Sequence, residues 1–472
     1  MSAWLERWFG LKQQQSSPRT EVLAGVTTFM TMAYIIFVQP AVLSQAGMDF
    51  NSVMMATCLS AAAASMFMGV LANYPIALAP GMGENFFFTF TVIIAAGVPW
   101  QTALGIVLLS GLLFMLLNLF RIRQALIDAI PESLKHAIAG GIGLFIAFIG
   151  LSEAGIITRN NGPLAGAVFS GELTIPALLD RLGLYEVASG AVKLGDLSNP
   201  GTLLAIFGIV ATFFFLVRRI KGAIFWGILL TLIVGLISGL VQWQGLASAP
   251  PSMAPTFLKA DLLDALQMKY LPIILVFLFM AVFDTIGTMI GVCDRAGFIK
   301  EGKLPKASRI LWVDATGTML GALFGTSTVT AYIESAAGVE EGGRTGLTAI
   351  VTGLFFLAAI FFSPLIRMVG GGVPAAPGSS LLLYPITAPA LIVVGCLMIQ
   401  SAAKIKWDDL TEAIPAFLLM IGMPLTYSIA DGLAFGFITY PLLKIFSGRV
   451  KETSWLVYLL GVIFVARYIF LR

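Results

Sequence analysis

The stretch that decides the fold is residues 326–338, which read TSTVTAYIESAAG. It is rich in threonine and serine and holds one acidic residue, Glu334, yet long apolar stretches flank it on both sides. β-Branched residues favour an extended backbone, and non-helical backbone is tolerated at membrane depth only where it is buried or lines a cavity. We therefore expect a broken membrane span here, with a short extended segment and then a half-helix that begins near Tyr332.

A second broken span is expected at 75–95, where residues 75–88 read PIALAPGMGENFFF. Prolines and glycines interrupt this apolar run, and a shift of 250 residues places its one acid, Glu84, on Glu334. Each broken segment is third in a set of seven apolar stretches, and an odd-numbered repeat places its two copies in opposite membrane orientations. Inverted repeats with paired interrupted helices are a common architecture of secondary transporters, with substrate bound near mid-membrane.

The composition places most of the chain in lipid. Of 472 residues, 58% are apolar and 11% charged, and the mean hydropathy is +0.93, whereas a soluble domain is about a quarter charged. This excludes a secreted disulfide scaffold, a nucleic-acid binder and an ordinary cytosolic enzyme. Unbroken stretches near the length of about 20 residues that a membrane helix needs are 21–44, 53–71, 102–120, 134–152, 201–217, 222–241, 271–292, 309–324, 346–366, 382–402, 410–429 and 431–446.

The predicted fold class is an all-α polytopic membrane protein with about fourteen transmembrane helices in a 7+7 inverted repeat, whose third and tenth spans are broken and carry short extended strands. The last apolar stretch, 455–466, is either a fifteenth crossing or an interfacial helix. Basic residues such as Arg218, Arg219 and Lys221 gather in loops that a cytoplasmic N-terminus would place inside, as the positive-inside rule requires. We expect a multi-pass protein of the plasma (inner) membrane.

Three carboxylates stand deep in apolar segments: Glu84, Asp284 and Glu334. Each costs roughly 3 kcal/mol or more there, and none has a Lys or Arg within its own span. They are candidates for holding a proton or a polar ligand with N–H donors, although a structural role for each remains the alternative. Asp314 lies close to the end of its span and is expected to pair with a loop arginine.

Three motifs carry a resemblance to a known family. They are residues 19–29 (RTEVLAGVTTF), residues 283–292 (FDTIGTMIGV), and residues 325–339, which GGRTGLT follows at 342–348. With these motifs the chain resembles the azaguanine-type purine permeases, a branch of the nucleobase–cation symporter-2 superfamily. One departure is Glu84, because an apolar residue is common at that position in the family.

The resemblance implies proton-coupled uptake of purine bases (adenine, guanine or hypoxanthine) by alternating access. It implies a core domain, 21–120 and 270–368, that moves against a gate domain, 130–245 and 380–470. It assigns substrate binding to Asp284, Glu334 and Tyr332, and the residues of the two broken spans add Glu84, Phe87, Ser335 and Thr330 as expected substrate-binding residues. Proton coupling is assigned to Asp284 and Glu334.

Two other functions are compatible with buried carboxylates in a membrane protein. An anion exchanger of the same fold is disfavoured because carboxylates at mid-membrane repel anions. A membrane-embedded enzyme could use paired carboxylates for acid–base chemistry, but no nucleophile motif or metal cluster accompanies them in the sequence. The expected partners are a purine base, protons and the lipid bilayer, with no cofactor, no metal and no nucleic acid. The preferred purine, proton against sodium coupling, and the oligomeric state, with a homodimer among the possibilities, are left open.

Overall fold

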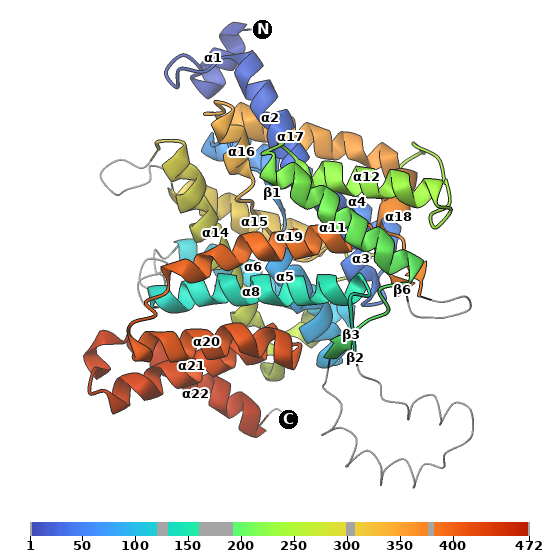
Figure 1. The fold of residues 1–472 in the computed structure, drawn as a ribbon. Coiled ribbons are helices and arrows are strands. Elements are labelled where there is room, and N and C mark those ends of the chain that lie inside the picture. The colour runs from blue at the N-terminus through green and yellow to red at the C-terminus, as the bar shows by residue number, and fades with distance from the viewer. Residues whose placement is uncertain (1, 120–130, 160–191, 299–306, 376–381, 471–472) are drawn as a thin grey trace, which may run out of the picture.

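The computed structural model describes residues 2–119, 131–159, 192–298, 307–375 and 382–470. Within these ranges, eight helices are long and apolar enough to cross a membrane, and five shorter apolar helices accompany them. The protein is therefore a helical, multi-pass membrane protein, as the composition predicted (Figure 1).

The first half of the chain holds the elements of seven spans and the segments between them. They are α1 (Ser2–Phe9), α2 (Pro18–Met32), α3 (Ile35–Ser44), α4 (Phe50–Phe67), the π-helix η1 (Met68–Ala72), β1 (Leu78–Pro80), α5 (Met82–Phe86), the π-helix η2 (Phe87–Ala95), α6 (Trp100–Leu119), α8 (Glu132–Glu153), β2 (Ile157–Arg159), β3 (Val192–Leu194), α11 (Pro200–Val217) and α12 (Ala223–Ile237).

The second half repeats this order. Its elements are α13 (Leu262–Ala265), η3 (Met268–Tyr270), α14 (Leu271–Arg295), α15 (Ala307–Phe324), β4 (Val329–Ala331), α16 (Ser335–Glu340), α17 (Gly346–Ala359), η4 (Ile360–Phe362), α18 (Ser363–Gly370), β5 (Val373–Pro374), β6 (Leu382–Leu383), α19 (Ala388–Met398), η5 (Ile399–Lys404), α20 (Leu410–Thr426), α21 (Ile429–Phe446), η6 (Val450–Glu452) and α22 (Trp455–Phe470).

The two predicted breaks are present, and they meet. β1 and β4 form an antiparallel pair in which Leu78 lies opposite Ala331, and α5 and α16 follow the two strands. The prediction of extended segments in the third and tenth spans is confirmed. Helix α16 begins at Ser335, three residues after the expected start, because the backbone N–H of Tyr332 still donates to Ala77 O (3.0 Å) across the pair. Pairing satisfies backbone groups that lipid cannot.

Helix starts follow local sequence signals. Ser17 and Asp49 cap α2 and α4, since their side chains accept hydrogen bonds from Thr20 N (3.2 Å) and Ser52 N (2.8 Å). Side-chain oxygens at this position satisfy N–H groups that have no partner within the helix. The first span contains a break that the hydropathy pattern did not indicate, because α2 ends at Met32 and α3 begins at Ile35.

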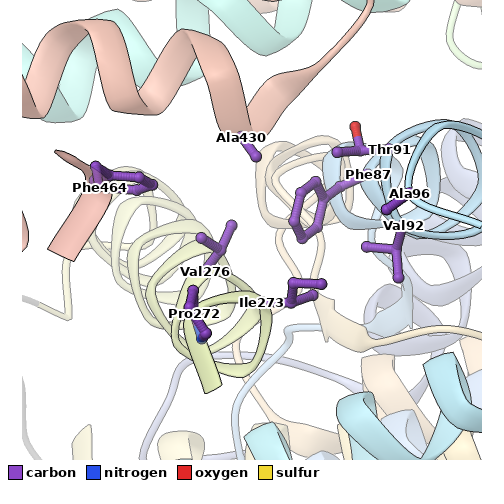
Figure 2. Close-up of a pocket in the computed structure, with 9 residues that line it drawn as sticks. All are labelled: Phe87, Thr91, Val92, Ala96, Pro272, Ile273, Val276, Ala430 and Phe464. Atoms are coloured by element: carbon purple, nitrogen blue, oxygen red, sulfur yellow. The ribbon is translucent and has the colours of Figure 1, made fainter. Parts of the chain in front are cut away.

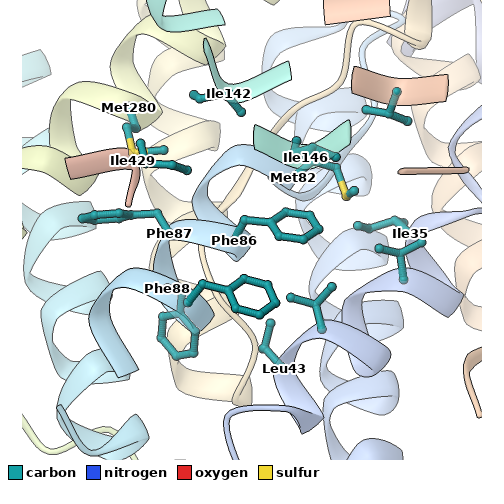
Figure 3. Close-up of a cluster of buried hydrophobic side chains, with 14 of the residues drawn as sticks. Ile35, Leu43, Met82, Phe86, Phe87, Phe88, Ile142, Ile146, Met280 and Ile429 are labelled. Carbon is teal, nitrogen blue, oxygen red and sulfur yellow. The ribbon is translucent and has the colours of Figure 1, made fainter. Parts of the chain in front are cut away.

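Elements far apart in the sequence lie side by side. Helix α4 packs against α15 and α17, and α2 packs against α16 and α17. In a second group, α8 packs against α19 and α20, and α20 packs against α21 (Figure 1). At the centre, Phe86, Phe87 and Phe88 of the α5–η2 segment are buried in an apolar cluster (Figure 3).

The C-terminal helix α22 runs along α21. The rings of Phe437 and Phe464 stack with centroids 6.0 Å apart, and the Tyr468 hydroxyl donates to Asp431 Oδ1 (2.7 Å). Because Asp431 lies in the first turn of α21 and Tyr468 near the end of α22, the two helices are antiparallel. Helix α22 therefore packs along the length of α21, which is one of the candidate membrane spans.

Candidate functional site

The fold brings three carboxylates from three separate elements together beside the β1–β4 pair. Asp284 lies in α14, Glu334 directly precedes α16, and Glu84 lies in α5. Asp284 is close enough to both glutamates to interact with them electrostatically. In the described part of the chain, none of the ion pairs reaches any of these carboxylates. The site is a set of acceptors without a fixed cation.

Asp284 is surrounded by many protein atoms, yet its side chain is exposed at the surface of α14. Gly287, one turn further along α14, is also exposed, and a Cβ added to it would meet no atom within 4 Å. Gly291 is half-buried and faces Ile333, which is 49% exposed. Residues spaced three and seven apart share one helix face. Asp284, Gly287 and Gly291 therefore form one accessible face of α14 that runs toward its C-terminal end.

Tyr34 holds Glu334. Its hydroxyl donates to Glu334 Oε1 (2.7 Å), and the Thr31 hydroxyl donates to the Glu334 backbone oxygen (3.3 Å). Tyr34 is 1% exposed and lies at the break between α2 and α3. Sequence reasoning missed Tyr34, and the signal that could have found it is a phenol hydroxyl inside an apolar span, which needs a buried partner.

Asp314 contradicts its sequence-based expectation. It is fully buried and accepts hydrogen bonds from Thr285 Oγ1 (2.6 Å) and from the backbone N–H of Ala331 (2.9 Å). Thr285 also contacts Thr330 Oγ1 (3.0 Å). These two donors lie inside the protein, and among the described residues no ion pair joins Asp314 to a loop arginine. Asp314 ties α14, next to Asp284, to strand β4.

Two residues expected to contact substrate, Tyr332 and Ser335, also join the two broken spans, and a third, Thr330, joins the second broken span to α14. The Tyr332 hydroxyl donates to Pro80 O, the backbone N–H of Ala77 donates to Ser335 Oγ (3.0 Å), and Thr330 binds Thr285. Of the three, Thr330 also lies within hydrogen-bonding reach of the Asp284 carboxylate. Tyr332 and Ser335 therefore stabilise the packing of the two broken spans. Their contact with a substrate stays a prediction.

Glu84 and Phe87 differ in their surroundings. Glu84 is 2% exposed, its carboxyl lies against Gly81, and its Oε1 has no hydrogen-bond partner among the described residues. Phe87 packs on Phe277 (centroids 4.8 Å apart) and lines a small cleft (Figure 2). The cleft is lined by Phe87, Thr91, Val92, Ala96, Pro272, Ile273, Val276, Ala430 and Phe464. None of these nine lining residues is an acid. The cleft is therefore separate from the carboxylates around Asp284.

The first and third sequence motifs meet at Glu21. This buried carboxylate accepts hydrogen bonds from the backbone N–H groups of Arg344 (3.0 Å) and Thr345 (3.2 Å) and from Thr348 Oγ1 (2.5 Å). It therefore caps the start of α17 from α2. A negative charge at a helix N-terminus is stabilising, and the motifs thus specify a contact between the two repeats.

The fold and the site together define the class of protein: a polytopic membrane protein in which two broken spans meet beside carboxylates that form no ion pair with the described residues. The Permease family matches at residues 19–179 and 174–435, and the chain belongs to this family. It is 42% identical to the guanine/hypoxanthine permease PbuG of Bacillus subtilis (99% of this chain, 100% of PbuG) and 41% identical to the adenine permease AdeP of Escherichia coli (99% and 96%). The resemblance to purine permeases is confirmed, and the protein is a transporter rather than an enzyme.

Solved structures identify the fold. The transmembrane domain of the cyanobacterial bicarbonate transporter BicA superposes with a TM-score of 0.62 over 89% of this chain and 97% of that domain, at 14% identity. At this identity the likeness concerns the fold alone, which is the 7+7 inverted repeat that the sequence predicted.

Proposed function

We propose that this protein takes up purine nucleobases together with protons by alternating access. The observation that carries the proposal is the exposed Asp284 beside Glu334, where two broken spans meet and where no basic side chain of the described residues forms an ion pair with either acid. The printed names of PbuG and AdeP, which are guanine/hypoxanthine and adenine permeases, supply the substrate class.

The geometry suits a purine edge. Ionised carboxylates offer only acceptors, and purines carry ring N–H and amino donors along one edge. Glu334, held at 2.7 Å by Tyr34, would accept from the base, and Asp284 would complete the contact from α14. A hydrogen bond to a charged group contributes about 1.5–3 kcal/mol, so each carboxylate can supply roughly a tenfold to hundredfold gain in affinity.

Proton coupling follows from the cost of charge at this depth. An ionised residue without a partner is expensive inside a membrane, and a proton removes that charge. Asp284 is the proposed proton carrier because its exposed side chain can exchange with water. Glu334 shares the proton-coupling role while it accepts a hydrogen bond from the base.

For alternating access, we propose that residues 21–120 and 270–368 form the core domain and that 130–245 and 380–470 form the gate domain. Packing of α4 with α15 and α17, and of α8 with α19 and α20, supports this division. With the N-terminus in the cytoplasm of a plasma-membrane protein, the accessible face of α14 runs from Asp284 toward the cytoplasmic side.

The proposal is tested with radiolabelled adenine, guanine and hypoxanthine in cells that lack their own purine permeases. Uptake should rise as external pH falls and should collapse with a protonophore. Uptake driven by a sodium gradient alone, unaffected by the protonophore, would refute the coupling. Sulfate or bicarbonate exchange without purine uptake would refute the substrate class.

A further inference from the structure

A second polar cluster lies beside the β1–β4 pair. Gln39 Nε2 donates to Thr326 Oγ1 (2.8 Å) and Ser327 Oγ (3.1 Å), and Ser327 Oγ donates to Asn85 Oδ1. Thr328 follows in the same extended segment. These five side chains, here named the amide cluster, are at most 1% exposed. They contain no charged group, so they are separate from the carboxylates described above.

Three polar atoms of the amide cluster lack a partner within the described ranges: Gln39 Oε1, Asn85 Nδ2 and Thr328 Oγ1. Buried polar groups are almost always hydrogen-bonded, because leaving one unsatisfied is costly. The set combines an acceptor, a donor and a hydroxyl that can be either. The amide N–H group would repel a cation, and the amide oxygen would repel an anion. A water molecule can accept from the N–H group and donate to the oxygen, so water is the occupant that fits this set.

The amide cluster adjoins Glu84. Asn85 follows Glu84 in α5, and the N–H of Gly81, against which the Glu84 carboxyl lies, donates to Thr328 O (3.1 Å). Glu84 Oε1 also lacks a partner in the part of the chain that is described. The titratable groups that act on Glu84 or are acted on by it are Asp284, Asp314 and Tyr332.

The cluster lies toward the outer end of its spans. Gln39 is in the last third of the span Pro18–Ser44, and Thr326 follows the end of α15 at Phe324. Next to it, Gly325 is covered by Thr256 of the segment that joins the two halves of the chain. Under the proposed orientation, the amide cluster therefore occupies the path between the outer surface and Glu84, whereas Asp284 lies on the face of α14 that runs toward the cytoplasmic side.

We propose that the amide cluster binds water and forms the route by which protons from the outer side reach Glu84. A bound water gives a proton to a carboxylate oxygen of Glu84 and regains one from the outer side. The proton moves on to Asp284 and leaves to water along α14, and no other bond changes. This inference rests on the proposed proton-coupled function. It adds the residues through which the proton enters from the outer side.

The test is Thr328→Val, which removes the unpartnered hydroxyl at constant shape. If the cluster is dry, this change leaves folding and transport unaffected or improves stability. The matched control is Thr28→Val, since Thr28 is equally buried, its hydroxyl is also unpartnered among the described residues, and it lies against Gly338 rather than in the cluster. Purified protein in liposomes is measured for purine uptake driven by an acidic exterior and for exchange of labelled against unlabelled purine at equal pH.

We expect Thr328→Val to lower pH-driven uptake about 2- to 10-fold, the loss of one neutral hydrogen bond, with exchange and melting temperature unchanged. Thr28→Val should match the unmodified protein in both assays. Unchanged pH-driven uptake in Thr328→Val overturns the inference, and so does an equal fall in uptake and exchange, which would indicate base binding instead. If the unmodified protein exchanges purine but ignores pH, the proton route fails while purine transport stands. If it does not exchange purine, the proposed function fails first.

Discussion

Tyr34→Phe isolates the contact that positions Glu334. Tyr34 is 1% exposed, and its hydroxyl donates to Glu334 Oε1 at 2.7 Å. Phenylalanine keeps the ring and removes one hydrogen bond, so folding should survive. A hydrogen bond to a charged group contributes about 1.5–3 kcal/mol, which corresponds to about 10- to 150-fold in a binding constant. Losing it leaves Glu334 free to turn away from the base, so affinity should fall by up to this factor.

The chain supplies a matched control in Tyr440, whose hydroxyl donates to Glu412 Oε1 at the same distance of 2.7 Å and which is 2% exposed. Binding of labelled adenine and hypoxanthine to purified Tyr34→Phe and Tyr440→Phe proteins measures the difference. We expect a weaker dissociation constant for Tyr34→Phe alone. If the two variants bind within about twofold of each other, which is under 0.5 kcal/mol, the positioning role of Tyr34 is refuted.

Three further outcomes are expected. Glu334→Gln should abolish purine binding, whereas Asp284→Asn should still exchange purine but lose proton-driven accumulation; equal loss of binding in both would reject this division. Glu84→Gln should change the pH profile of uptake or the ratio of rates among purines, and unchanged profiles and ratios would make Glu84 structural. Hydrogen bonding, first from the Thr411 hydroxyl, lowers the pKa of Asp409 to about 2, below an unfolded value near 3.9. The stabilisation is therefore present above pH 4 and lost as pH falls toward 2, so the melting-temperature deficit of Asp409→Ala should shrink between pH 6 and pH 3, and a constant deficit would contradict it.

Sequence alone was sufficient for the membrane-spanning character, the two broken spans and the repeat that relates them. Each of these depends on local composition: long apolar runs require lipid, and the Thr-rich run at 326–331 and the Pro-Gly run at 75–83 interrupt helices wherever they occur. The extended strands appear where these runs predict them. The three deep carboxylates were visible for the same reason, because an acid in an apolar run stands out.

Which donors meet those acids was decided only by the tertiary structure. Tyr34 and Glu334 are 300 residues apart, and the hydrogen bonds of Asp314 to Thr285 and Ala331 depend on how β4 packs between α14 and α15. Hydropathy measures how apolar a segment is. It does not show which face of a helix carries a single hydroxyl, such as that of Tyr34 or Thr285. Polar pairing, by contrast, requires distances near 3 Å and a defined angle, which exist only after the helices have packed. The sequence thus determined the location of the charges, and the packing determined their partners.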